Sequence, residues 1–233
     1  MSPSAPKRLL GRQIFLLLPF FLGACTTISP SRPDSPAASS RDNASLRRDG
    51  AAEDLAPALR KQIVRYTTKE SPGTVIVDPA NRFLYLVLEG GKALRYGVGV
   101  GREGMAWSGT ADVALKREWP RWTPTRNMIA REPEKYTKWS GGMDGGPDNP
   151  LGARALYLFQ GGKDTLYRIH GTNEPWSIGT AMSSGCIRMM NDDVIDLYRR
   201  VPVGAKVVVL PAGNKVVESN AVAGPSATAV PRP

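Results

Sequence analysis

The stretch from Pro72 to Pro211 alternates short apolar runs with glycine, proline, asparagine and aspartate residues. The runs are rich in β-branched and aromatic side chains, which favour strands. Between two of them, Glu89-Gly90-Gly91-Lys92 predicts a tight hairpin turn, because glycine adopts a positive φ without steric cost. Strands are therefore predicted over Thr74–Asp78, Arg82–Leu88, Lys92–Val100, Thr110–Arg117, Arg154–Gln160, Asp164–His170 and Lys206–Leu210.

One helix is predicted after residue 190. Asn191 can cap its start, and Asp192 and Asp193 favour the positive N-terminal end of a helix. An apolar stripe over residues 194–198 follows, and Pro202 marks the end. Many strands and little helix predict a mainly β fold, either a β-sandwich or a closed mixed sheet, with a few short helices.

The segments that flank this domain have a different composition. Residues 26–45 are dominated by serine, proline, alanine and charged side chains, which favours a flexible tether. Residues 53–69 carry apolar side chains at helix-like spacing, but Pro57 limits a helix start, and the second half fits a strand equally well. Residues 212–233 resemble the tether in composition and predict a disordered tail.

The N-terminus has the pattern of an export signal. Lys7, Arg8 and Arg12 precede an apolar run over residues 14–22 that is short for a membrane-spanning helix. The run ends in Leu22-Gly23-Ala24-Cys25, which resembles the lipobox of bacterial lipoproteins. The resemblance implies that residues 1–24 are removed and that Cys25 receives an acyl anchor. The alternative is an ordinary signal peptide that happens to contain a cysteine.

Charge and composition exclude several classes of function. The formal net charge is +10, but it is spread along the chain and forms no basic tract, which argues against a nucleic-acid partner. One histidine and two cysteines are too few for a cage of histidine and cysteine metal ligands. We therefore expect neither a metal nor a cofactor.

Once Cys25 is assigned to lipid, the exported domain has one thiol, Cys186, and one imidazole, His170. A lone cysteine in an oxidising compartment is either a small buried apolar residue or a reactive group. Ser183-Ser184-Gly185-Cys186 fits a turn that presents the thiol, and His170 ends a predicted strand. Arg188 could lower the thiol pKa, bind a substrate carboxylate or form a surface salt bridge. These residues alone leave each choice open.

Two motifs resemble the active-site signature of the L,D-transpeptidase family, whose catalytic domain is called YkuD. They are His170-Gly171-Thr172-Asn173 and Ser183-Ser184-Gly185-Cys186-Ile187-Arg188-Met189, followed by Asn191. The resemblance covers residues 72–211 and implies a YkuD-type fold with its helix after the catalytic cysteine. It also implies peptidoglycan stem peptides as partners, and either stem peptides or a protein as acyl acceptor. The location follows from the lipobox instead: Thr26, rather than aspartate, after Cys25 predicts an outer-membrane lipoprotein facing the periplasm.

The same resemblance implies roles for individual residues. Cys186 attacks the stem peptide and releases D-alanine, and His170 is the base, oriented by the carbonyl of Gly171. Backbone N–H groups near Gly185 and Cys186 form the oxyanion hole. Arg188 binds a substrate carboxylate or shapes that hole, and substrate contacts are also assigned to Ser183, Ser184 and Asn173.

One position departs from the family pattern. Most members have a second histidine directly before the glycine of the cysteine motif, where this chain has Ser184. The base, His170, is present. The hydrogen bond or substrate contact that the second histidine would supply is expected to change. A hydrolase on the same site and a non-catalytic wall-binding lipoprotein remain as alternatives. Five tryptophans could line a glycan groove or lie in the core: Trp107, Trp119, Trp122, Trp139 and Trp176.

Overall fold

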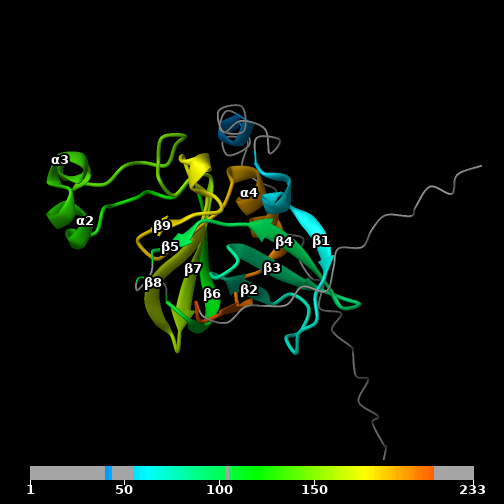
Figure 1. The fold of residues 1–233 in the computed structure, drawn as a ribbon. Helices are drawn as coiled ribbons and strands as arrows, with labels where there is room; N and C mark the ends of the chain where they lie inside the picture. Colours follow the sequence, from blue (N-terminus) through cyan, green and yellow to red (C-terminus); the bar gives the residue numbers. More distant parts are fainter. Residues whose placement is uncertain (1–39, 44–54, 103–104, 106, 213–233) are drawn as a thin grey trace, which may run out of the picture. The chain divides into compact units, whose positions relative to one another are not determined.

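The computed structural model describes residues 40–43, 55–102, 105 and 107–212 (Figure 1). The predicted signal peptide, the lipidation site Cys25 and the tail beyond residue 212 lie outside the described residues. Within the described part of the chain, no helix has the length and apolar character needed to span a membrane.

A mixed sheet of nine strands forms the core of the fold, in the order β1-β4-β3-β2-β11-β6-β7-β8-β10. Neighbouring strands are antiparallel except for β11 beside β2 and β10 beside β8. A second sheet pairs β5 with β9. The predicted mainly β fold with a mixed sheet is thus confirmed. The strands are β1 (Gln62–Arg65), β2 (Val75–Asp78), β3 (Phe83–Leu88), β4 (Lys92–Gly97), β5 (Val100–Gly101), β6 (Gly109–Glu118), β7 (Arg154–Gln160), β8 (Lys163–His170), β9 (Ala181–Ser183), β10 (Ile187–Arg188) and β11 (Lys206–Val209).

The strands at the centre of the sheet are nearly all apolar because both faces are covered. All four residues of β2 are buried, and so are the middle four of β3. The turn between β3 and β4 has the predicted form, with Gly90 at φ 70° and Gly91 at φ 66°. The main apolar core, with Leu84, Leu156 and Leu197 among its fully buried members, joins the sheet to helix α4, and a second cluster that includes Ile76 and Tyr85 packs separately.

Helix α4 (Asn191–Arg200) is the predicted helix, but its start differs from the prediction. Met190 occupies the N-cap position, and no side chain caps the helix there. The Asn191 side chain instead forms hydrogen bonds with the backbone N–H of Ala153 and the backbone carbonyl of Thr172, which lie in two different loops. The assignment of Asn191 as the cap was therefore wrong.

Two α-helices and three 3-10 turns were not predicted: α2 (Arg126–Arg131), α3 (Pro133–Tyr136), η2 (Pro57–Leu59), η3 (Thr137–Trp139) and η4 (Pro175–Ser177). Helices α2 and α3 bury none of their residues, so their sequences carry no apolar stripe. Together with η3 they form an excursion over residues 119–153 between β6 and β7. Figure 1 shows α2 and α3 projecting from the sheet.

The segment predicted as a tether is partly built into the domain. The alternatives left open for residues 53–69 resolve as η2 and the edge strand β1, which pairs with β4. Further upstream, residues 40–43 are helical and Asp42 is buried. Strand β1 is one of the two alternatives left open for residues 53–69, and only residues 40–43 differ from the predicted tether, because the Asp42 carboxylate has a buried partner.

Candidate active site

The two residues predicted to react lie at the same edge of the large sheet. His170 is the last residue of β8, and Cys186 directly precedes β10. The two strands are parallel, with Arg188 opposite His170 and Ile187 opposite Ile169. Extending this register places Cys186 opposite residue 168, on the same face as His170, because side chains alternate along a strand. The two Cα atoms are then about 8 Å apart, from the ordinary strand spacing and rise.

The thiol lies against the backbone of an irregular part of β8. Cys186 Sγ is 3.9 Å from the carbonyl oxygen of Leu166, and Leu166 has a positive φ of 65°. The pairing of β7 with β8 shifts register at this point, which re-aims the backbone toward the cysteine. Burial raises the pKa of the Cys186 thiol, while the charges of Arg168 and Arg188 act in the opposite direction. The raised pKa favours the protonated thiol over the thiolate.

His170 is held in one tautomer by its own chain neighbour. Its Nδ1 lies 2.6 Å from the carbonyl oxygen of Gly171. Because a carbonyl only accepts, Nδ1 carries the proton and Nε2 is left as an acceptor. Burial lowers the pKa of His170 to about 4, with a further contribution from the charge of Arg188. The resting pair is a neutral thiol and a neutral imidazole.

Asn191 fixes the backbone that orients His170. Its Oδ1 accepts from the N–H of Ala153 at 2.8 Å, and its Nδ2 donates to the carbonyl of Thr172 at 2.8 Å. A Cβ on Gly171 would lie 2.1 Å from Asn191 Oδ1, so only glycine fits. Sequence reasoning missed this positioning role, although the same residue belongs to the recognised motif.

The loop before Cys186 is shaped by Ser183 and Gly185. The buried Ser183 hydroxyl donates to the carbonyl of Cys186 at 2.7 Å and accepts from the N–H of Gly185 at 3.1 Å. Gly185 has φ 123°, and a Cβ there would lie 2.6 Å from a ring carbon of Tyr167. The Gly185 N–H is thus already bound to Ser183, and the predicted oxyanion role of that group requires this bond to open.

The other predicted substrate contacts have partners within the domain. Arg188 donates to Glu174 at 2.7 Å, and Asn173 donates to the carbonyl of Asp148 at 2.9 Å. The exposed Ser184 hydroxyl, where the family usually has histidine, accepts from Arg131 at 3.2 Å. Sequence reasoning missed Glu174 and Arg131, because neither belongs to a motif and both contacts are long-range in the fold.

Some of the tryptophans lie in the core, and others are exposed enough to line a groove. Trp119 and Trp122 are buried, as the core interpretation requires. Trp107 is half-buried and stacks on Tyr167, close to the cysteine loop. Trp176 follows the His170 motif and is 67% exposed.

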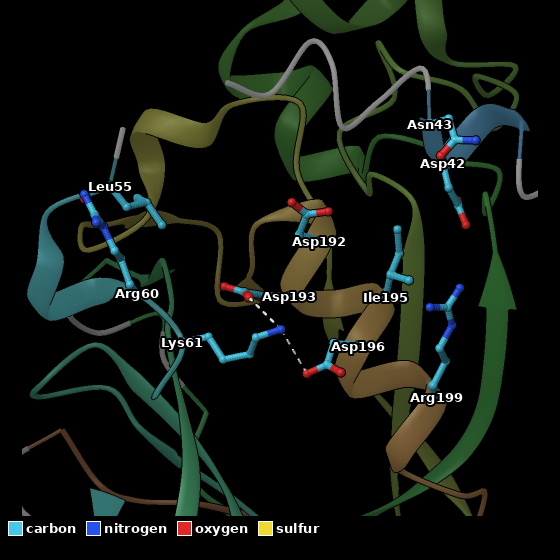
Figure 2. A pocket seen from close by; sticks show the side chains of 10 residues that line it. All are labelled: Asp42, Asn43, Leu55, Arg60, Lys61, Asp192, Asp193, Ile195, Asp196 and Arg199. Atoms are coloured by element: carbon cyan, nitrogen blue, oxygen red, sulfur yellow. Dashed lines mark hydrogen bonds and ion pairs between the residues drawn. The ribbon is translucent and has the colours of Figure 1, made fainter. Parts of the chain in front are cut away.

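A separate pocket lies between α4 and the N-terminal segments (Figure 2). Its lining includes Asp42, Lys61 and Asp193, and neither Cys186 nor His170 belongs to it. Lys61 forms ion pairs there with Asp196 at 3.2 Å and Asp193 at 4.0 Å. Within the described residues, no group of three or more histidine, cysteine, aspartate or glutamate side chains is placed to hold a metal ion.

Comparison with known proteins identifies the family of the chain. A family model described as the L,D-transpeptidase catalytic domain, YkuD, matches residues 72–209. The chain belongs to the L,D-transpeptidase family. The matched range contains both strands and both loops that carry the site.

Two curated relatives illustrate the similarity. Probable L,D-transpeptidase ErfK/SrfK of Escherichia coli K12 is 35% identical over 141 residues, which cover 58% of this chain and 43% of that protein. The protein of the same name from Salmonella typhimurium is 37% identical over 142 residues, covering 58% and 43%. This L,D-transpeptidase chain thus spans less than half the length of these relatives.

Solved structures were also found. One, described as a probable carnitine operon oxidoreductase from Brucella melitensis, is 53% identical and covers 70% of this chain and 99% of that chain, with a TM-score of 0.47. An L,D-transpeptidase from Mycobacterium smegmatis is 18% identical and covers 59% and 58%, with a TM-score of 0.43.

Proposed function

We propose that this chain is a peptidoglycan acyltransferase with Cys186 as nucleophile and His170 as base. The observation that carries the proposal is the tautomer of His170. Its Nδ1 donates to the Gly171 carbonyl, which makes Nε2 the nitrogen that accepts a proton, at the sheet edge that also holds Cys186. Membership of the family and the match over residues 72–209 support the same chemistry.

In the first half-reaction, Sγ attacks the carbonyl of the third stem-peptide residue, a diamino acid. Because both groups are neutral at rest, the thiol proton moves to Nε2 as the S–C bond forms. The imidazolium then protonates the nitrogen of D-alanine, which leaves as the C–N bond breaks. The product is a thioester at Cys186.

In the second half-reaction, an amine attacks the thioester and gives its proton to Nε2. The C–N bond forms, and the thiol leaves with that proton. The side-chain amine of another stem peptide yields a 3-3 crosslink, whereas an amine on a protein attaches that protein to the wall. Water as the acceptor would make the enzyme a carboxypeptidase.

The proposal includes the location of the enzyme. The sequence Leu22-Gly23-Ala24-Cys25 supports a lipid anchor, and Thr26 after it supports the outer membrane, with the domain in the periplasm. Labelling of the protein with a fatty-acid analogue in cells tests the anchor. Label should be present in the natural protein and absent after Cys25→Ser.

The chemistry is tested by incubating the full chain with disaccharide tetrapeptides and analysing products by mass spectrometry. We expect joined peptides and free D-alanine, with a loss of at least about 1000-fold in Cys186→Ala and His170→Ala. Thermal melting of both variants controls for folding. Shortened peptides alone would show a hydrolase. No product, together with no carbapenem adduct on Cys186, would show a non-catalytic binding protein.

A further inference from the structure

Four arginines lie around the cysteine loop and differ in how their charge is balanced. Arg168 forms a two-pronged pair with Asp164 at 2.7 and 2.8 Å, and Arg188 is paired with Glu174. Arg102 donates to the carbonyl of Met182. Arg131 donates one hydrogen bond, to the hydroxyl of Ser184.

The charge of Arg131 is not balanced by any carboxylate within the described ranges. Its chain neighbour Glu132 pairs with Lys135 instead. A guanidinium has five N–H donors in a planar fork that matches a carboxylate, and the bond to Ser184 uses one of them. Arg131 therefore presents an unfilled anion-binding fork beside the reactive loop.

The excursion that carries Arg131 is fixed at its base. The Asn149 side chain, fully buried, donates to the carbonyls of Pro120, Met143 and Asp144, and accepts from the N–H of Leu151. Thr125 caps the start of α2 by accepting from the N–H of Met128 at 3.2 Å. These bonds tie the two ends of the excursion together at its base, and the bond from Arg131 to Ser184 joins α2 to the cysteine loop.

We propose that Arg131, with Ser184, binds the terminal carboxylate of the acyl donor, and so selects donors that end in a free carboxylate. Ser184 is two residues before Cys186, so their Cα atoms are at most about 7.6 Å apart. In the donor, one Cα and one nitrogen separate the attacked carbonyl from the carboxylate of the leaving D-alanine. That spacing suits a cation held at Ser184. The inference rests on the proposed acyl transfer.

The first test compares two alkylating reagents of similar size, iodoacetate and iodoacetamide, on the full chain. Peptide mass spectrometry reads the modification of Cys186 separately from Cys25. Because both reagents react with the same thiolate, the ratio of their rates cancels any change in thiol pKa. Arg131→Gln should lower the iodoacetate-to-iodoacetamide ratio about fivefold, the size of an exposed ion pair.

Matched variants make this result specific. Arg126→Gln removes an exposed arginine from the same helix and should leave the ratio unchanged. Arg131→Lys keeps the charge and should recover part of the ratio. Equal ratios in Arg131→Gln and Arg126→Gln would overturn the proposal.

The second test uses the donor itself. Replacing the terminal carboxylate of the tetrapeptide by a carboxamide should lower kcat/KM in the natural protein and have little effect in Arg131→Gln. If the protein forms crosslinks but Arg131→Gln leaves the alkylation ratio unchanged, the anion site is overturned and the acyl transfer stands. An Arg131-dependent ratio in a protein that forms no thioester would overturn the acyl transfer and leave the anion site standing.

Discussion

The two halves of the large sheet are built differently. In the first half, formed by β1, β4, β3, β2 and β11, the strands pair in unbroken register. In the second half, formed by β6, β7, β8 and β10, the pairing shifts at Val113–Leu115 and again at Tyr157–Phe159. His170 and Cys186 lie at the end of the second half. The two residues proposed to react thus lie in the part of the sheet where regular pairing stops.

The difference extends to what holds each half together. The first half relies on aliphatic packing, which is non-directional and tolerates change. Around the second half, single polar side chains hold loops by directed hydrogen bonds, as Asn191 and Asn149 do. The first half is therefore held by apolar contacts shared among many residues, whereas the loops of the site depend on a few polar side chains.

The largest effect is expected from the buried ion pair of Arg154 and Asp42. Arg154 is almost fully buried and bonds to both carboxylate oxygens of Asp42, at 2.8 and 2.7 Å. Asp42→Ala leaves the guanidinium buried and unpaired, which should lower the free energy of unfolding by about 3–5 kcal/mol in urea denaturation. Crosslinking should also fall, because the Arg154 carbonyl accepts from the N–H of Gly171.

The control for this prediction is an exposed pair in the same half. Asp144 pairs with Arg121 at the surface, with 88% of the Asp144 side chain exposed. Asp144→Ala should change the free energy of unfolding by less than about 1 kcal/mol. If Asp42→Ala were as mild, residues 40–43 would not hold Arg154 in solution.

A smaller loss is expected from Asn191→Ala. The substitution removes the partners of the Ala153 N–H and the Thr172 carbonyl, both in the buried loops that flank Gly171. Two broken buried hydrogen bonds should cost about 2–4 kcal/mol in urea denaturation. Because Gly171 orients His170, crosslinking by the folded fraction should drop as well.

Asn81→Ala provides the comparison from the first half. The half-buried Asn81 donates from its side-chain amide to the buried carboxylate of Asp78 in the turn between β2 and β3, and in the variant Asp78 keeps the bond from the backbone N–H of residue 81. We expect a loss of about 1 kcal/mol and full crosslinking activity. Equal activity losses in the two variants would show that Asn191 has no particular role in the site.

The same contrast explains what could be predicted from the sequence. The strands of the first half follow from local alternation and turn residues, and β2, β3 and β4 lie where predicted within a few residues. Strands β9 and β10 are too short to produce a pattern. Helices α2 and α3 bury no face, so no apolar stripe reveals them.

The site was predicted only as far as the motifs reach. The motifs identified Cys186 and His170, but not the residues that hold them from a distance. Asp42 lies in a stretch whose average composition is that of a tether, and nothing local marks one carboxylate as the partner of Arg154. Asn191 was interpreted from its neighbours in sequence, whereas its bonds are to loops far away in the chain.

The smallest net effect is expected for the pH dependence of stability, because two buried groups change the free energy of unfolding in opposite directions. Burial lowers the pKa of His170 to about 4, below its ordinary value of 6.5, and raises the pKa of Asp193 to about 6, above 3.8. As pH falls from 6.5 to 4, His170 becomes protonated in the unfolded chain but stays neutral in the folded chain. The folded state therefore loses stability relative to the unfolded state. Over nearly the same range the folded chain binds a proton on Asp193 more readily than the unfolded chain, which stabilises it.

Variants of each residue separate the two contributions. Each shift corresponds to about 3 kcal/mol, so they nearly cancel in the natural protein. Between pH 6.5 and 4, Asp193→Asn should lose about 3 kcal/mol more stability than the natural protein, and His170→Gln about 3 kcal/mol less, in urea denaturation at each pH. If His170→Gln followed the natural protein across this range, the imidazole would be solvated, and burial would not lower the pKa of His170.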